Sequence, residues 1–324
     1  MKIIKYRNYF LIFSGTLTVI AILFWIMWGL NLGIDFTGGS LLEIEYTQDR
    51  PAVSDVQSKL ADLQLKGLRI QAAGEQGYIL RFQDTGEEIH QKVMAKLEGE
   101  KTTDSDLKIE TTGNAKVDVV TDAGLAQVIE KKYESIGPSI GAELKTKAFY
   151  AIILVVIGIV IYIAISFRKV SYPVSSWKYG VAAIIGLVQT ILVTLGVFVI
   201  LGKFFGFEIN TPFVAALLTI LGYSVNDTIV VFDRVRENLH KYEGEFEEIV
   251  EKGLWETMAR SINTTLTTEL ALLALLIFGG GVINDFVIPL LVGIFFGAYS
   301  SIFIASQVLV VWQKLDWALK KSEN

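Results

Sequence analysis

Six stretches of apolar residues dominate the hydrophobic pattern of this chain. A helix that crosses a bilayer needs about 20 predominantly apolar residues. Such stretches lie near residues 10–30, 148–167, 179–201, 212–232, 262–283 and 286–312. The pattern predicts a polytopic α-helical membrane protein with six transmembrane helices. The first stretch lacks a small-residue cleavage pattern at its end, so we interpret it as an uncleaved anchor.

The lysines and arginines predict the orientation of these helices, because loops on the cytoplasmic side are enriched in both residues. They gather before the first helix, after the second, after the fourth and after the sixth, whereas the short opposite loops hold only Lys203. Both termini are therefore predicted to be cytoplasmic, in a cell membrane. The predicted regions are 1–31 with helix 1, an extracytoplasmic domain over 32–147, helices 2–6 over 148–313, and a cytoplasmic tail over 314–324.

Strand and helix patterns alternate within the predicted outer domain. Strands are expected at 41–46, 68–72, 78–82 and 107–112, and amphipathic helices at 53–63 and 87–97. The order βαββαβ predicts a ferredoxin-like α+β fold. A further amphipathic pattern over 242–258 predicts a cytoplasmic helix at the membrane surface. Its polar face is rich in glutamate, which anionic lipids would repel, so protein is the expected support.

The composition argues against several kinds of functional site. With 52% hydrophobic and 19% charged residues and a net charge of -5, the chain offers no basic surface for nucleic acid. It has no cysteine and only two histidines, which argues against thiolate or histidine metal sites and against a cysteine nucleophile. We therefore expect no cofactor and no metal.

Three ionisable residues lie inside the predicted spans: Asp227, Arg260 and Glu269. Such groups are costly in hydrocarbon and point to function by default. Asp227 lies roughly 10 Å inside the inner boundary of its helix, at 1.5 Å per residue. Polar residues that suit a seam between helices accompany Asp227: Ser224, Asn226 and Thr228.

Arg260 and Thr264 share a face of the following helix, and Thr268 continues it. The two helices are antiparallel, so this face and Asp227 are expected at comparable depths, where they can meet. A carboxyl that gains and loses a proton beside a permanent cation makes a minimal proton-controlled switch. The alternative is a static buried pair that fixes packing, and for Arg260 a simple boundary residue. Glu269 has no expected partner.

Three glycine motifs are interpreted as structural. Gly293, Gly297 and Ser301 form a small-residue stripe for close helix contact. The segment 137–141 is expected to be a rigid return to the membrane. The turn that leads out of the first helix lacks the setting of a phosphate-binding loop. Its characteristic residues are Gly33, Asp35, Phe36, Gly38 and Gly39.

Taken together and in order, four stretches resemble the SecF family of protein-export membrane subunits. They are 33–39, 133–144, 222–238 and 260–268. The resemblance implies six helices that form half of a pseudo-symmetric twelve-helix assembly with a SecD-like subunit, similar to exporters of the resistance-nodulation-division superfamily. It also implies proton conduction through Asp227, Arg260 and Thr264. Glu269 departs from the family, which usually has an apolar residue there.

These observations lead to a specific hypothesis: a non-enzymatic accessory subunit that uses the proton-motive force to promote protein translocation across a bacterial inner membrane. The partners implied are a SecD-like subunit, the Sec translocon channel, a translocating unfolded polypeptide and membrane lipids, without nucleic acid. One alternative is a proton-driven exporter of small molecules or lipids of the same superfamily. Another is a membrane scaffold that transports nothing, in which case Asp227→Asn would preserve activity.

Overall fold

The computed structural model describes residues 3–98, 128–167, 174–279 and 281–322. The chain divides into two compact units. The first, here called the sheet unit, is Gly33–Lys145, and the second, the helical unit, combines Met1–Leu32 with Thr146–Asn324.

The sheet unit is built around four antiparallel strands in the order β2-β3-β1-β4. The strands are β1 (Gly39–Tyr46), β2 (Arg69–Ala73), β3 (Gly77–Phe82) and β4 (Val128–Ile136). Two helices connect them, α3 (Val53–Leu60, extended by the 3-10 turn Ala61–Leu63) and α4 (Glu87–Glu98). This order and these connections are those of a ferredoxin-like fold, so the predicted fold class is confirmed.

The core of the sheet unit lies between the sheet and these two helices. Alternate residues of β1 and β3 point toward the helices, as a half-buried sheet requires, and α3 and α4 contribute the apolar face opposite. The buried members are Leu42, Ile44, Tyr46, Val56, Leu60, Tyr78, Leu80, Phe82, Val93, Leu97 and Val128.

The last strand differs from the prediction. The expected strand at 107–112 lies outside the described residues, and β4 is the strand that completes the sheet beside β1. β4 is an edge strand whose middle residues, such as Glu130 and Lys131, are exposed. Edge strands are protected by charge, and the apolar alternation that identifies a strand in the sequence is therefore absent.

The glycine turn before β1 forms a short helix, α2 (Ile34–Thr37), followed by two glycines with positive φ. A Cβ atom on Gly38 would lie 2.8 Å from the Cα of Pro138, and one on Gly39 would lie 2.6 Å from the carbonyl oxygen of Phe82. Gly141 approaches the same turn, since its Cβ would lie 2.9 Å from the Gly38 nitrogen. The two glycine segments thus pack backbone against backbone.

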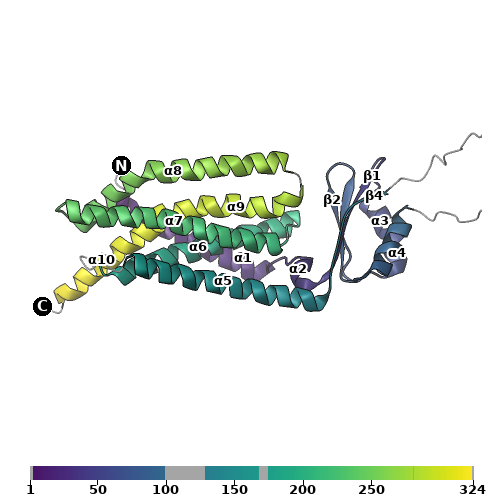
Figure 1. The fold of residues 1–324 in the computed structure, drawn as a ribbon, viewed down its shortest axis with the longest axis horizontal. Coiled ribbons are helices and arrows are strands. Elements are labelled where there is room, and N and C mark those ends of the chain that lie inside the picture. Colours follow the sequence, from purple (N-terminus) through teal and green to yellow (C-terminus); the bar gives the residue numbers. More distant parts are fainter. Residues whose placement is uncertain (1–2, 99–127, 168–173, 280, 323–324) are drawn as a thin grey trace, which may run out of the picture. The chain divides into compact units, whose positions relative to one another are not determined.

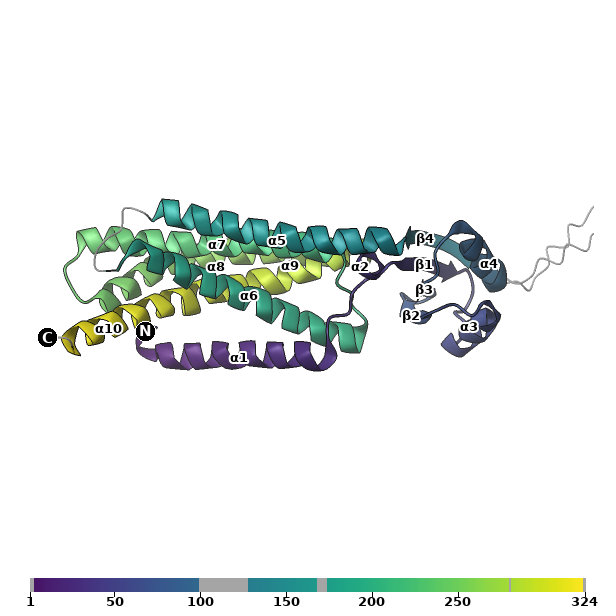
Figure 2. The same cartoon turned by 90° about the horizontal axis from the view of Figure 1, so that it is seen from below.

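The helical unit contains six helices long and apolar enough to cross a membrane, as the sequence predicts. Its elements are the 3-10 turn Ile4–Tyr6, α1 (Arg7–Trp28), α5 (Pro138–Ser166) from residue 146 onward, α6 (Ser176–Phe205), α7 (Thr211–Lys241), α8 (Phe246–Phe278), α9 (Gly281–Ser300), the π-helical turn η3 (Ser301–Ala305) and α10 (Ser306–Ser322). The last span, Ile283–Leu315, runs through α9, η3 and α10. The described ends of the chain lie at one end of this bundle (Figures 1 and 2).

The segment 242–258 was predicted as a helix at the membrane surface, and most of it forms the start of a longer helix. Residues 246–258 are the first turns of α8, which continues without a break into the fifth span. Their apolar face packs in the main core of the helical unit through Phe246, Val250 and Leu254. Protein does support this face, as expected, but the continuous helix carries it into the bundle rather than along the membrane surface.

At the same end of the bundle, two glutamates of α8 hold the start of α1. The Glu251 carboxylate accepts hydrogen bonds from the backbone N–H groups of Ile3 and Ile4, both at 2.7 Å. Glu247 pairs with Arg7 and with Lys314 of α10. A carboxylate at a helix N-terminus satisfies unpaired N–H groups and complements the helix dipole. Three helices are therefore tied together at one point.

Candidate functional site

Asp227 lies on α7, which packs side by side with α8 and α9 in the bundle (Figures 1 and 2). The helix begins after Asn210, whose side chain accepts the backbone N–H of Phe213, and Pro212 occupies its first turn. Buried positions follow at intervals of three and four residues, and Asp227 falls among them with 7% of its surface exposed. The acid thus lies on the face that packs against other helices.

The direct partner of Asp227 is Ser261 of α8. The Ser261 hydroxyl donates a hydrogen bond of 2.5 Å to Oδ1, and the serine is 1% exposed. The other oxygen, Oδ2, is buried and has no hydrogen-bond partner among the described residues. One half of the carboxyl group is fixed, and the other half is open to a proton or a water molecule.

Arg260 and Thr264 are exposed on α8, and no ion pair joins Arg260 to Asp227 in the described part of the chain. Small residues four apart form the face of α8 that turns toward its neighbours: Gly253, Thr257, Ser261 and Thr265, here called the small-residue stripe. Arg260 lies 100° around the helix from Ser261, so it misses this contact. Its charge still acts on Asp227 by Coulombic attraction.

A second polar contact joins α7 and α8 farther from the termini. The Tyr223 hydroxyl lies 3.5 Å from the Thr268 hydroxyl, which also donates to the carbonyl of Thr264 at 2.9 Å. Tyr223 precedes Asp227 by one turn. We call the line formed by the Asp227–Ser261 and Tyr223–Thr268 contacts the α7–α8 seam.

The polar neighbours of Asp227 on α7 divide between two faces. Ser224 and Thr228 are buried against η3, where the Thr228 hydroxyl lies 2.7 Å from that of Ser301. Asn226, in contrast, is exposed. The last span can approach α7 closely because of its predicted small residues, since a Cβ on Gly293 would lie 2.2 Å from Ile220. π-Helical turns within α-helices are frequent at functional sites.

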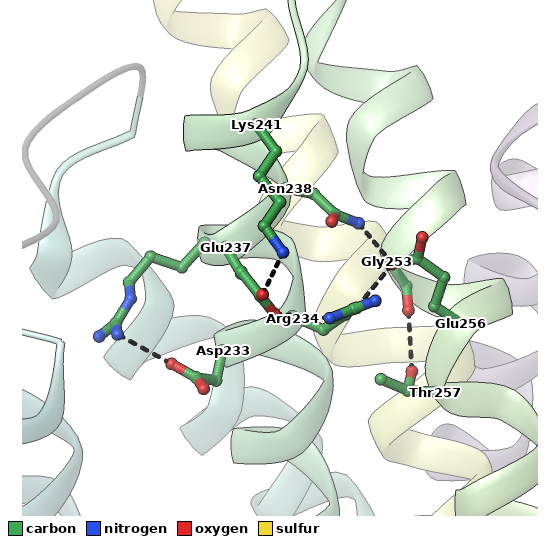
Figure 3. A network of polar contacts seen from close by, with 9 residues as sticks. Asp233, Arg234, Glu237, Asn238, Lys241, Gly253, Glu256 and Thr257 are labelled. Carbon is green, nitrogen blue, oxygen red and sulfur yellow. Dashed lines mark hydrogen bonds and ion pairs between the residues drawn. The ribbon is translucent and has the colours of Figure 1, made fainter.

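A network of charged and polar side chains fixes α8 against the end of α7 (Figure 3). The central member is Arg234, which pairs with Glu237 and Glu256, both at 2.6 Å. Asn238 donates to the same Glu256 carboxylate at 2.8 Å, and Gly253 lets the two backbones approach, since its Cβ would lie 2.9 Å from Val235. Because Gly253 is two turns from Ser261 on the small-residue stripe, this network sets the register of the α7–α8 seam.

The site offers oxygens and hydroxyls without a metal cage. The described residues contain no group of three or more histidine, aspartate and glutamate side chains that could hold a metal ion. A lone buried carboxyl with one open oxygen and a hydroxyl partner can bind and release a proton. Sequence reasoning missed Ser261, although it continues the spacing of Gly253 and Thr257.

The sequence matches the family model for the C-terminal region of the SecD/SecF protein export membrane proteins over residues 116–315. A second model, the SecD/SecF GG motif, matches residues 29–49, which include α2 and its two glycines. The chain belongs to the SecD/SecF family. It is 39% identical to the protein translocase subunit SecF of Thermobaculum terrenum, over 98% of this chain and 95% of the relative.

The SecF-like chain also resembles larger proteins of the family. It is 33% identical to the protein translocase subunit SecDF of Bacillus subtilis, over 95% of this chain but only 37% of that protein. The crystal structure of SecDF, a translocon-associated membrane protein of Thermus thermophilus, superposes with a TM-score of 0.78 at 29% identity. The match covers 97% of this chain and 39% of that one. The chain is a multi-pass membrane protein that corresponds to part of each SecDF protein.

Proposed function

We propose that this chain is the SecF-type subunit of a protein translocation machine and that it couples the proton-motive force to export through Asp227. The near full-length similarity to SecF relatives supports an accessory role in Sec-dependent translocation. The observation that carries the coupling is the buried Asp227 carboxyl, held by Ser261 on one oxygen and open on the other. One proton that crosses the membrane supplies about 2.3 kcal/mol per 100 mV, enough to bias two arrangements of packed helices.

In this mechanism, protonation of Asp227 changes the α7–α8 seam. The charged carboxylate attracts Arg260 and accepts the Ser261 hydroxyl, whereas the neutral acid loses the attraction and gains a donor. The charged network around Arg234 carries any shift of α8 along α7 to the end of the bundle. The chain then acts by conformational change rather than by covalent chemistry, with Arg260, Thr264 and Thr268 beside the path. The GG motif acts as a structural connection.

The partner proposed is a SecD-like subunit, which would cover polar groups that this chain leaves exposed within its spans. On α8 these are Arg260, Asn263, Thr264 and Thr267, and on α7 Asn226. Arginine and asparagine side chains that faced lipid would be costly, so a second helical half is the expected neighbour. The other partners proposed are the translocon channel, a translocating unfolded polypeptide and surrounding lipids. The termini would lie in the cytoplasm and residues 32–147 outside.

The partner is testable because the chain has no cysteine. Asn226→Cys introduces a single thiol on the exposed face of α7, and Leu154→Cys places one on a 72% exposed site of α5. In native membranes we expect a thiol-reactive crosslinker to join Asn226→Cys, but not Leu154→Cys, to the SecD-like subunit. Equal crosslinking of both positions, or crosslinking of neither, would contradict the proposed interface.

The coupling is tested by secretion of a reporter protein in cells whose only copy carries Asp227→Asn, with membrane levels of the variant measured. We expect secretion to fall to the level of the deletion strain. The matched control is Asp233→Asn, which changes an exposed acid on the same helix and should leave secretion near the parent level. Normal secretion by Asp227→Asn, with unchanged sensitivity to an uncoupler, would rule out the proposed coupling.

A further inference from the structure

Glu269 is the ionisable residue of the spans that the mechanism above leaves unused. It lies on α8, partly buried, eight residues beyond Ser261. Its Oε1 atom is buried and has no hydrogen-bond partner among the described residues, while the carboxyl lies against the main chain of Phe295 on α9. A polar atom kept unsatisfied in a membrane helix costs stability, so it needs a reason.

The position of Glu269 follows the small-residue stripe. Residues four apart drift by 40° on a helix, so Ser261, Thr265 and Glu269 form one line that turns gradually from α7 toward α9. Thr265 stands between the other two, and its hydroxyl is also buried without a hydrogen-bond partner among the described residues. At 1.5 Å per residue, each step along this line rises about 6 Å, and Glu269 lies roughly 12 Å from the level of Asp227.

The other titratable groups of α7 and α9 near this part of α8 each have a partner. Tyr223 contacts Thr268, Asp285 accepts the Asn210 amide at 2.5 Å, and Tyr299 lies 3.1 Å from the Ser14 hydroxyl. Arg260 is on α8 itself, nine residues away and on the opposite side of the helix. Among the described residues of this region, Glu269 is thus the carboxyl that keeps an oxygen without a hydrogen-bond partner.

From this placement we infer that Glu269 is a second proton-binding group, which exchanges protons with Asp227 through the Thr265 and Ser261 hydroxyls and serves the half of the path farther from the chain termini. The proton moves from one carboxyl to the other by relay between hydroxyl oxygens and intervening water, and no covalent bond other than O–H forms or breaks. The inference rests on the proposed function, because it extends the path that begins at Asp227.

The test is proton uptake into proteoliposomes that hold the full chain with its SecD-like partner, measured with a pH-sensitive dye while the external pH is varied. Glu269→Gln keeps the size of the side chain and removes its titration, so we expect uptake to fall by about tenfold or more, as when a positioned acid–base group is lost. Glu269→Asp should restore most of the uptake with a shifted pH profile. Glu243→Gln, an exposed acid between α7 and α8, is the matched control and should behave like the parent.

A structural role for Glu269 gives a different result. If Glu269→Gln keeps the parent's uptake and pH profile, the residue does not carry protons and the inference is overturned. If the Gln and Asp variants lose uptake equally, with the same pH profile, the site needs a shape and not a carboxyl, which also overturns it. Asp227→Asn distinguishes failure of this inference from failure of the proposed function. When Asp227→Asn abolishes uptake and Glu269→Gln does not, the proposed function stands and only the second proton-binding site is ruled out. When Asp227→Asn has no effect, both fail.

Discussion

The core of the sheet unit and the α7–α8 seam of the helical unit bury different kinds of side chain. In the first, Leu42, Ile44 and Leu80 are 0% exposed and pack against apolar helix faces. In the second, Asp227 and Ser261 are 7% and 1% exposed, and Oδ2 of Asp227 has no hydrogen-bond partner among the described residues. Apolar burial stabilises a fold, whereas unsatisfied polar burial costs stability and is retained at functional sites. Four substitutions measure this difference.

The largest effect is expected in the sheet core. Leu80→Ala removes a fully buried side chain of β3 and leaves a cavity, so the sheet unit should lose about 3 kcal/mol of stability. The measurement is hydrogen exchange of the β1 and β3 amides in the purified full chain. Val53→Ala, at a position 42% exposed, is the control and should change little. Comparable protection in both variants would contradict the assigned core.

Gly39→Ala tests the backbone packing beneath that core. The new Cβ would lie 2.6 Å from the Phe82 carbonyl oxygen at a φ of +130°, so we expect a loss of about 2 kcal/mol from strain and displacement of β3. Gly137→Ala is matched, because its Cβ would meet nothing within 4 Å. The same exchange experiment applies, and equal protection in the two variants would show that the close approach is not needed.

Ser261→Ala tests the seam. It removes the hydroxyl that binds Asp227, so the helical unit should lose about 1–2 kcal/mol and melt at a lower temperature in detergent. Reporter secretion should fall as well, because the carboxyl loses the group that holds it. Thr16→Ala removes an exposed hydroxyl of α1, outside the proposed partner interface, and serves as the control. A variant that melts earlier but secretes normally would make Ser261 a packing residue only.

The smallest effect at neutral pH is expected from Tyr46→Phe. The Tyr46 hydroxyl is buried without a hydrogen-bond partner among the described residues, so its removal should change stability by less than about 1 kcal/mol. Burial, with a smaller contribution from Tyr78, raises the pKa of Tyr46 from 10.0 to about 12. As the pH rises, the unfolded chain therefore releases the Tyr46 proton before the folded chain does. The contribution of this group to stability is fully present below pH 10 and is lost as the pH rises through about 12.

Exchange protection measured from pH 8 to 12 checks the sign of this effect. The sheet unit of the parent should lose stability above pH 10. The Tyr46→Phe variant should lack the part of this loss of stability that Tyr46 causes. An identical alkaline decline in both proteins would mean that Tyr46 titrates at its ordinary value.

Periodicity was sufficient for the parts of the fold that bury one continuous apolar face. The six spans and the strands β1 and β3 were predictable on this ground. β4 was not, because an exposed edge strand such as Val128–Ile136 carries charges where a central strand carries apolar residues. The continuity of α8 was not predicted either, since residues 246–258 and the fifth span form one unbroken helix.

The depth of the candidate site in the helical bundle was predictable from the sequence, but the side-chain contacts within it were not. Charge in an apolar run was enough to identify Asp227, and antiparallel helices placed it level with residues 260–264. Which of these residues turns toward α7 depends on helix phase, and one position separates Arg260 from Ser261. The small-residue stripe supplies that phase, because close helix packing requires small side chains at the contact.

The π-helical turn Ser301–Ala305 gives the last span two contact faces. Before it, Gly293 and Gly297 point to α7, and around it Ser300 binds the Gly186 carbonyl of α6 at 2.7 Å. A π-turn holds one more residue than an α-turn. Removal of a single residue from 301–305 would therefore convert this turn to regular α-helix, whereas removal of a residue within α9 or α10 would rotate everything after it by about 100°. In comparisons of homologues, a one-residue difference in length should therefore fall in this short segment rather than in the α-helical parts of the span.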